Sequence, residues 1–228
     1  MIKKILVVGV TSKIAKQFLL TKSSKCELYG TYNNNPLKKE KLLKGQFKLD
    51  LSSVTSINSF IDLVSDITFD GMIIFASTYV ADPLTKNEME SRYQSDMFIN
   101  VTSVAIIAKN INFQAGSKIV VLGDNGTSLP KKGYSSYTLS KLALDEVVKV
   151  LAVDLAPNVS TICIKLGPTL SNHHLLRNDH YYDKGLIKVK DPTRGLINFI
   201  NFLINEPNFN TTGSVVNYDG GAYLRRNP

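Results

Sequence analysis

Seven short segments of the chain are almost continuously apolar, and helical patterns follow most of them. The apolar segments are residues 4–10, 27–32, 46–51, 71–76, 117–122, 160–166 and 214–218. Because polar residues do not alternate with apolar ones, we expect strands that are buried on both faces, as in a parallel sheet. Helical patterns cover residues 13–22, 54–66, 87–111, 134–155 and 192–205. This alternation predicts an α/β fold: a Rossmann-type, doubly wound parallel sheet of about seven strands, flanked by helices.

Two connections depart from the alternation. Only residues 36–44 separate the second strand from the third, so we expect an abbreviated crossover there. Residues 169–191 have no regular pattern, and irregular stretches of that length in compact domains are often binding loops. We therefore predict a substrate loop at 169–191. No low-complexity linker divides the 228 residues, so residues 1–228 are predicted to form one domain.

The composition is that of a globular protein, with 43% hydrophobic and 20% charged residues. No apolar run approaches the ~20 residues that would span a bilayer. Lys13 interrupts the N-terminal apolar run, which therefore predicts a first strand and not a signal peptide. The two cysteines, Cys26 and Cys163, lie in predicted strands without metal-ligand or disulfide spacing, so we expect buried thiols and no metal. These features predict a cytoplasmic protein that does not act at membranes.

The formal net charge of +8 admits two interpretations. Apart from Lys38, Lys39, Lys41 and Lys44, the basic residues are dispersed, and no nucleic-acid-binding motif accompanies them. We therefore predict no nucleic-acid partner. The charge is either a solvated lysine-rich face or a field that attracts an anionic ligand such as a phosphorylated dinucleotide.

The turn after the first strand has part of a dinucleotide-binding pattern. Gly9 permits a tight turn, and the helix that follows offers free N–H groups to a pyrophosphate, from a segment containing Thr11, Ser12, Lys13 and Ile14. Lys13 and Ala15 stand where later glycines are usual. Taken alone, an ordinary strand–helix turn explains the segment equally well.

The ends of the next two strands indicate which dinucleotide would bind. The second strand ends at Tyr32 and Asn33, and no carboxylate is present there. A carboxylate at this point would bind the ribose 2′-hydroxyl of NAD and repel a 2′-phosphate. This absence, together with Lys13, favours NADP(H). Asp50 and Leu51 end the third strand, where Asp50 would accept a bond from the adenine amine or serve as a cap or turn residue.

A possible proton donor lies on the helix predicted at 134–155. Tyr137 and Lys141 are four positions apart and share one helix face. A free phenol has a pKa of about 10, and a nearby ammonium lowers it toward the range useful at neutral pH. Such a pair is common on helices by chance. Asp124, at the end of the fifth strand, and Asn100, an amide in an apolar helix that needs a partner if buried, strengthen the case.

In this order along the chain, the motifs resemble the short-chain dehydrogenase/reductase family over essentially the whole length. The matching positions are Gly9, Asp50, Ala76-Ser77, Asn100, Asp124, Tyr137 with Lys141, Leu166-Gly167 and Tyr218-Asp219-Gly220-Gly221. The resemblance implies an NADP(H)-dependent oxidoreductase acting on a small molecule. Tyr137 would supply a proton, Lys141 would hold the ribose and tune Tyr137, and Asn100 would support a water-linked relay. Asp124 would orient Tyr137 or feed protons from solvent. Because a carboxylate beside a phenol raises the phenol pKa, Asp124 would oppose Lys141 unless it shares a proton, and we expect a coupled titration. Further cofactor contacts are implied at Ala76, Ser77, Gly167 and Thr169.

Asp124 stands where most members of that family have a serine. With Ala76-Ser77 and the basic Lys13, it is similar to the pteridine reductase and dihydromonapterin reductase branch. This similarity implies that Tyr79 stacks a dihydropterin-like substrate against the nicotinamide, and that Ser77, Asp124, Tyr134 and Tyr137 contact it. Tyr134 would otherwise pack within its helix. Phe75 stands where the family has Asn, and Lys13 where the branch has Arg.

The sequence leaves two alternative functions, and it also predicts an oligomeric state. The chain is alternatively a carbonyl reductase for a sugar or acyl intermediate, or a catalytically weak dinucleotide-binding sensor. The apolar faces of the helices predicted at 87–111 and 134–155 favour a homo-oligomer, a tetramer or a dimer, as is usual in the family.

Overall fold

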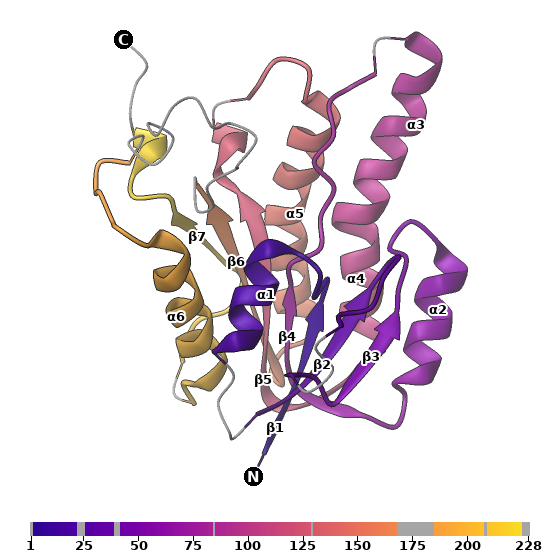
Figure 1. Cartoon of the computed structure of the whole chain (residues 1–228), viewed down its shortest axis with the longest axis vertical. Helices are drawn as coiled ribbons and strands as arrows, with labels where there is room; N and C mark the ends of the chain where they lie inside the picture. The colour runs from indigo at the N-terminus through magenta and orange to yellow at the C-terminus, as the bar shows by residue number, and fades with distance from the viewer. Residues whose placement is uncertain are drawn as a thin grey trace.

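A seven-stranded parallel sheet forms the centre of the protein, in the strand order β3-β2-β1-β4-β5-β6-β7 (Figure 1). The computed structural model describes residues 2–21, 26–38, 42–83, 85–128, 130–167, 185–207 and 209–224. The strands are β1 (Lys3–Val8), β2 (Cys26–Tyr32), β3 (Gly45–Lys48), β4 (Thr68–Ile74), β5 (Asn112–Asp124), β6 (Val159–Leu166) and β7 (Ser214–Tyr218). The predicted fold class, strand number and parallel arrangement are confirmed.

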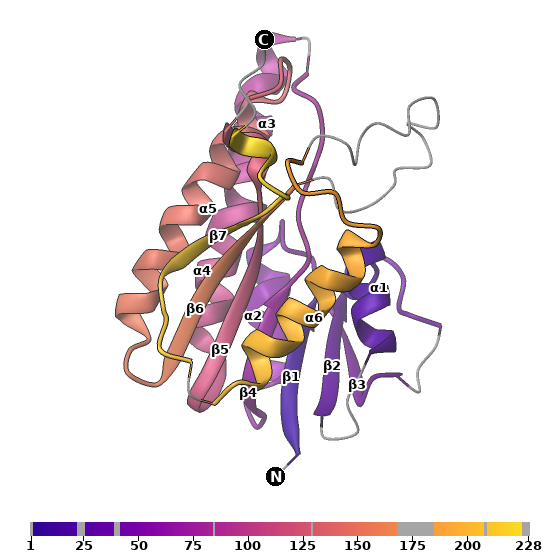
Figure 2. The ribbon, with the colours of Figure 1, turned by 90° about the vertical axis from the view of Figure 1, so that its left-hand side faces the viewer.

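Helices cover both faces of this sheet, as Figure 2 shows edge-on. The helical elements are α1 (Lys13–Leu20), α2 (Val54–Leu63), α3 (Lys86–Met97), the π-helical η2 (Phe98–Thr102), α4 (Ser103–Asn110), α5 (Ser135–Asp154), α6 (Pro192–Asn205) and the 3-10 turns η3 (Asn125–Ser128) and η6 (Ala222–Leu224). Helices α2, α4 and α5 bury apolar side chains in one core, and α1 and α6 bury theirs in a second core on the opposite face. Burial on both faces explains why the strands are continuously apolar.

The predicted helix over 87–111 is wrong in one respect, because a π-helical turn divides it into α3 and α4. The backbone N–H of Ser103 donates to the carbonyl of Phe98, five residues earlier. Such single π turns are rare and occur mostly where a side chain must be redirected. Here the turn contains Asn100, which is buried against the end of β4.

The predicted first strand, 4–10, ends earlier because Gly9 adopts a φ of +85°, a conformation that glycine reaches without strain. A Cβ on Gly9 would lie 2.8 Å from the Cβ of Ala76, so the ends of β1 and β4 can approach only with glycine there. The third strand also ends early, at Lys48, because the Asp50 side chain accepts from Ser52 and starts a turn.

The short connection between β2 and β3 has no α-helix among its described residues, as predicted. Residues 169–184 of the predicted substrate loop lie outside the described part of the chain. Residues 185–191 run beside the C-terminal turn, where the N–H of Ile187 donates to the carbonyl of Gly220. None of the described helices has the length and apolarity needed to cross a bilayer.

Candidate active site

Tyr137 and Asp124 meet where the carboxyl end of β5 approaches the first turn of α5. The buried Tyr137 hydroxyl donates to Asp124 Oδ2 over 2.5 Å. The backbone N–H of Gly126 donates to the other carboxylate oxygen, Oδ1, over 2.6 Å. The position of Asp124 is therefore set by both the phenol and the backbone of the turn that follows β5.

The lowered pKa that Lys141 alone would give Tyr137 is not found, and the opposing effect expected of Asp124 prevails together with burial. Burial raises the pKa of Tyr137 far above its ordinary value, and the negative charge of Asp124 and its hydrogen bond to the phenol raise that pKa further. The Lys141 Nζ lies 6.0 Å from the centroid of the Tyr137 ring, so it is too far away to compensate for a carboxylate in direct contact. The phenol is therefore a protonated hydrogen-bond donor at neutral pH.

Lys141 lies on the same buried face of α5 as Tyr137, as the spacing predicted. Its side chain is 3% exposed, and Nζ donates to the carbonyl oxygen of Leu122 over 3.1 Å. Burial lowers the pKa of Lys141, while the negative charges of Asp124 and Asp145 oppose that shift. Because a carbonyl carries no full charge, the ammonium depends on these more distant groups to remain protonated.

Asn100 has the polar partners that its burial demanded. Its Oδ1 accepts from the backbone N–H of Thr78 over 3.0 Å, and its Nδ2 donates to Ser140 Oγ over 2.9 Å. Through Asn100, the π turn thus links Thr78, in the segment after β4, to Ser140 in the second turn of α5. Ser140 is the residue beside Lys141 on α5. Asn100 therefore acts on the position of Lys141 only indirectly, by holding Ser140.

Two aspartates that the sequence analysis did not place in the site hold the start of α5. Asp82 accepts from the backbone N–H of Ser135 over 2.7 Å and from Ser136 Oγ over 2.8 Å. The fully buried Asp96 accepts from Thr78 Oγ1 over 2.8 Å and lies 2.7 Å from Ser136 Oγ, whose single proton goes to only one of the two aspartates at a time. The signal in the sequence was Ser135-Ser136 at a helix start, since free N–H groups there require an acceptor.

Two further tyrosines, Tyr79 and Tyr134, form an aromatic cluster with Tyr137. The Tyr79 ring stacks on Tyr134, with centroids 4.9 Å apart and planes 20° apart, and it meets the ring of Tyr137 edge-on, also at 4.9 Å. The Tyr134 ring therefore packs on Tyr79 and not only against its own helix. Lys131, which the sequence analysis missed, places its Nζ 4.3 Å above the Tyr134 ring.

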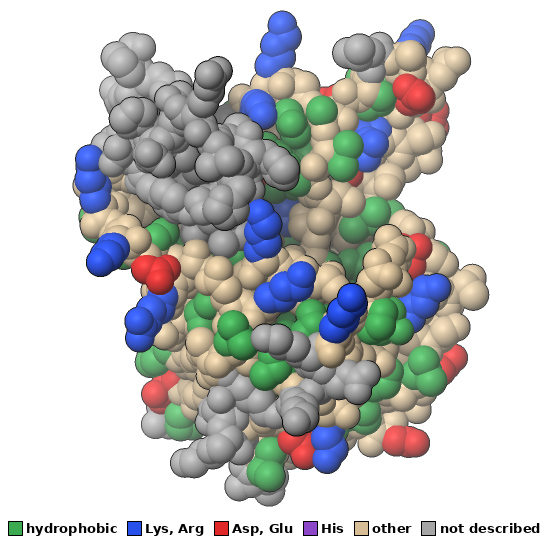
Figure 3. Space-filling view, in the orientation of Figure 1, with side chains coloured by type: hydrophobic (Ala, Val, Ile, Leu, Met, Phe, Trp, Pro, Cys, Tyr) green, Lys and Arg blue, Asp and Glu red, His purple; other side chains and the backbone are tan. Residues whose placement is uncertain are grey.

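The predicted cofactor residues gather at the carboxyl ends of β1 and β2. Ser12 caps α1 by accepting from the N–H of Ala15 over 3.1 Å, and Lys13 and Thr11 are exposed beside it. Ile14 instead packs against the core beneath α1. Among the other residues of this edge, Tyr32 is partly buried and Asn33 is exposed. Figure 3 shows basic side chains along a hollow at this level of the molecule.

The remaining predicted contacts have structural partners already. Asp50 forms a turn through Ser52, as one of its two interpretations predicted, while Leu51 is buried in the core. Ser77 Oγ donates within the segment after β4, either to the Thr78 carbonyl over 3.0 Å or to Asn100 Oδ1 over 3.2 Å. Gly167 packs so tightly on Asp219 that a Cβ would lie 2.5 Å from the aspartate's Cβ. Thr169 lies outside the described residues.

Phe75 departs from the family pattern for a reason that the structure makes plain. Its side chain is buried beneath α1, with its ring centroid 5.7 Å from that of Phe18. It therefore stabilises the contact between α1 and the sheet. An Asn at this position would leave polar atoms in that apolar layer.

Residues 9–223 match the family model described as enoyl-(acyl carrier protein) reductase. The chain belongs to the short-chain dehydrogenase/reductase family of oxidoreductases. The 3-oxoacyl-(acyl-carrier-protein) reductase FabG of Buchnera aphidicola is 26% identical over 189 residues, which cover 78% of this chain and 76% of that protein. The family that the motifs predicted is confirmed.

Solved structures of other short-chain dehydrogenases share the fold. A short chain dehydrogenase family protein from Francisella tularensis aligns with a TM-score of 0.82 and 21% identity, covering 99% of this chain and 100% of that one. A short chain dehydrogenase from Burkholderia cenocepacia, solved in complex with NADP, aligns with a TM-score of 0.81 and 18% identity, covering 96% and 97%. At these identities the likeness establishes the fold of this short-chain dehydrogenase/reductase.

Proposed function

We propose that the chain is an NADP(H)-dependent reductase that adds a hydride and a proton across a C=N or C=O bond of a small molecule. The observation that carries the proposal is the pairing of Tyr137 and Lys141 on one buried face of α5, with the Tyr137 hydroxyl 2.5 Å from Asp124 Oδ2. A protonated phenol at the carboxyl edge of a parallel sheet is suited to giving a proton to a ligand bound there.

The residues at the ends of β1 and β2 fit a phosphorylated dinucleotide. Gly9 has no side chain, so a pyrophosphate could approach the backbone of the turn closely. The capped N-terminus of α1 provides N–H groups, and the first turn of α1 has no acidic residue. Lys13 would hold a phosphate, and Asn33 offers no charge that would repel one. NADPH, when bound, supplies the hydride. The NADP in the Burkholderia relative's structure supports this choice.

The three polar residues of the site would divide the proton chemistry among them. Tyr137 would give its proton to the substrate's oxygen or nitrogen. The resulting phenolate would lie beside a carboxylate, which is unfavourable unless one of the two carries a proton. Asp124 is partly exposed, so we propose that it receives a proton from solvent and returns it to Tyr137. The Lys141 ammonium would offset the negative charge from 6.0 Å away.

For the substrate we propose a dihydropterin-like heterocycle. The Tyr79 side chain is 57% exposed and touches Tyr137, so a planar ligand stacked on it would lie next to the phenol. One ring face of Tyr79 already stacks on Tyr134 at 4.9 Å, which leaves no space for a ring between them. The heterocycle would therefore use the opposite face of Tyr79.

An acyl or other carbonyl substrate is the second candidate. The FabG relative and the matched family model are both named for reductases of acyl groups on a carrier protein. The deciding experiment follows NADPH consumption by the full chain with dihydrobiopterin, dihydromonapterin, dihydrofolate and a panel of small carbonyl compounds. NADH is tested in parallel. Dinucleotide binding without turnover of any compound would instead support a sensor.

We also propose a cytoplasmic homo-oligomer, a tetramer or a dimer. Helix α5 exposes four apolar side chains on its outer side: Leu139, Leu142, Val150 and Val153. Their exposed fractions range from 41% to 78%, and the exposed Met97 ends the neighbouring α3. A second copy of the chain, presenting the same face, would cover this surface.

A further inference from the structure

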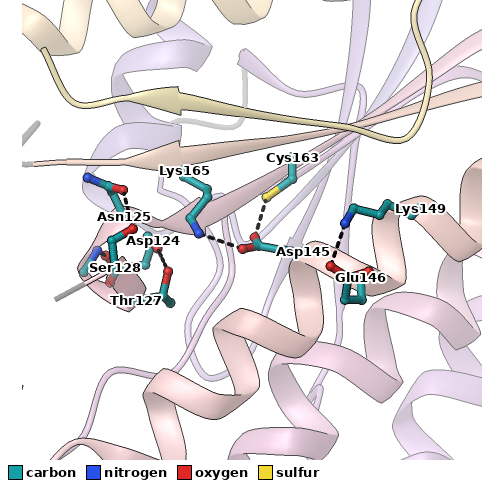
Figure 4. A network of polar contacts seen from close by, with 10 residues as sticks. Asp124, Asn125, Thr127, Ser128, Asp145, Glu146, Lys149, Cys163 and Lys165 are labelled. Atoms are coloured by element: carbon teal, nitrogen blue, oxygen red, sulfur yellow. Dashed lines mark hydrogen bonds and ion pairs between the residues drawn. The ribbon is translucent and has the colours of Figure 1, made fainter. Parts of the chain in front are cut away.

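A buried ion pair lies beneath the candidate active site, one helical turn from Lys141. Lys165 Nζ of β6 contacts Asp145 Oδ2 of α5 at 2.7 Å, and the two side chains are only 11% and 10% exposed. Figure 4 shows Asp145 directed from α5 toward Lys165 and Cys163 on the sheet. The same view contains an exposed pair on the next turn, Glu146 and Lys149, whose side chains are 69% and 52% exposed.

Both oxygens of the Asp145 carboxylate have partners. Lys165 binds Oδ2, and Cys163 Sγ donates to Oδ1 over 3.4 Å. Burial raises the pKa of Cys163 to about 12, and the adjacent Asp145 carboxylate contributes to that shift. The thiol therefore keeps its hydrogen and acts as a donor, so that the carboxylate is held in one place.

The cluster lies beside the residues of β5 that bind Lys141 and Tyr137. On β5, the Leu122 carbonyl accepts from Lys141, while Asp124 accepts from Tyr137. Gly123 lies between them, and a Cβ there would be 2.7 Å from Cys163 Sγ, 3.2 Å from Lys165 Cγ and 3.4 Å from Asp145 Oδ1. Three consecutive residues of β5 thus contact Lys141, the ion pair and Tyr137 in turn.

Lys141 needs nearby negative charge, because its own hydrogen bond is to a neutral carbonyl. The titratable and charged groups around it are Asp124 at the end of β5, Tyr137 and Asp145 on α5, and Cys163 and Lys165 on β6. Asp124 is already bonded to Tyr137 and would change its charge during turnover. Asp145 is buried, has fixed partners, and favours the charged form of Lys141.

We propose that Asp145, held by Lys165 and Cys163, is a positioning residue that keeps the buried ammonium of Lys141 charged and directed at the site. The purpose of this arrangement rests on the proposed reductase function, but the experiment below tests the role of Asp145 without measuring any reductase activity. The alternative is that the Asp145–Lys165 pair only stabilises the packing of α5 on the sheet. A structural role of that kind would leave the protonation of Lys141 unchanged.

The test measures the titration of Lys141 itself in the free protein, by NMR of lysine side chains labelled with ¹⁵N at Nζ and ¹³C at Cε. Lys141→Arg identifies the resonance. Asp145→Asn removes the carboxylate, and Asp145→Asn with Lys165→Met removes both charges, so that no buried charge is left unpaired if the single variant fails to fold. The exposed pair supplies the matched control, Glu146→Gln with Lys149→Met.

We expect the titration midpoint of Lys141 to fall by about one pH unit, a tenfold change in its acid dissociation constant, in any folded single variant. In the double variant the midpoint should also fall, but by less, because the loss of the positive charge of Lys165 partly offsets the loss of the carboxylate. The control is expected to retain the wild-type midpoint. A double variant whose midpoint equals that of wild type, or of the control, would overturn the inference. If the wild type reduces no substrate, the proposed function fails while this titration still decides the role of Asp145.

Discussion

The hydroxyl of Tyr137 donates to Asp124 Oδ2 across 2.5 Å, from the first turn of α5 to the last residue of β5. This contact makes the phenol and the carboxylate a coupled pair, because the charge on one changes the proton affinity of the other. It also means that the family's Tyr-x-x-x-Lys motif works here beside a carboxylate, and the pKa of Tyr137 is raised where the motif alone predicted a lowered one.

Removing the charge of Asp124 should move the pH dependence of turnover. In Asp124→Asn and Asp124→Ser, the phenol loses the carboxylate that raises its pKa, so Tyr137 should lose its proton at lower pH. Because the pKa of Tyr137 is far above 10 in the wild type, we expect the wild-type kcat/KM profile to show no alkaline limb from Tyr137 up to pH 10, and such a limb to enter this range in the variants. Profiles of NADPH oxidation between pH 5 and 10 check this. Unchanged profiles in both variants would remove Asp124 from the chemistry.

Tyr137→Phe should abolish the proton donor and retain the fold. We expect kcat to fall by about 10²–10⁴-fold, the usual contribution of a positioned general acid. NADPH affinity, measured by fluorescence titration, should change little. Tyr93→Phe is the matched control, because the Tyr93 hydroxyl also bonds a neighbour, Ser135 Oγ, but is exposed. A Tyr137→Phe enzyme with wild-type kcat would exclude Tyr137 as the donor.

Asn100→Ala should destabilise the protein through its hydrogen-bond network. The substitution leaves the N–H of Thr78 and the hydroxyl of Ser140 without their buried partner. We expect the free energy of unfolding to fall by about 2–3 kcal/mol, measured by urea denaturation. Asn110→Ala, which removes an exposed amide at the end of α4, should cost less than about 1 kcal/mol. Equal losses in the two variants would contradict this role for the network.

The choice of dinucleotide should depend on Asn33 and Lys13. In Asn33→Asp, a carboxylate would stand near the 2′-phosphate of NADPH, and in Lys13→Ala a phosphate-binding charge would be lost. We expect the KM for NADPH to rise at least about tenfold in each variant, with little change in the KM for NADH. Steady-state kinetics with both dinucleotides decide the matter. A wild-type enzyme that clearly prefers NADH would refute the assignment to NADP(H).

The exposed face of α5 should control assembly. Val150→Lys with Val153→Lys would place two charges in the proposed contact between copies, and a desolvated charge without a partner opposes association. We expect the variant to run as a smaller species than wild type in light scattering coupled to size exclusion. Lys48→Ala, which changes an exposed lysine on β3 at the opposite edge of the sheet from β7, should leave the assembly unchanged. If the wild-type chain were monomeric at micromolar concentration, the proposed homo-oligomer would be refuted.

The sequence by itself determined the order and type of the elements. Burial on both faces makes each strand apolar throughout, and the segments predicted at 192–205 and 214–218 match α6 and β7. The parallel order also places the strand ends at one edge, so Gly9, Asp124 and Tyr137 were predicted at a common site. These features depend on local periodicity and on the chain direction, which the linear pattern contains.

Tertiary structure decided which neighbours each polar group has. The π turn at Asn100, the aspartates 82 and 96 that hold the start of α5, the stacking of Tyr79 on Tyr134 and the ion pair of Asp145 with Lys165 all join residues that are distant in sequence. So does the bond from Tyr137 to Asp124, which, with burial, decided that the pKa of Tyr137 is raised and not lowered. A phenol's pKa depends on charges a few ångströms away and on burial, and both distances arise only when separate elements pack.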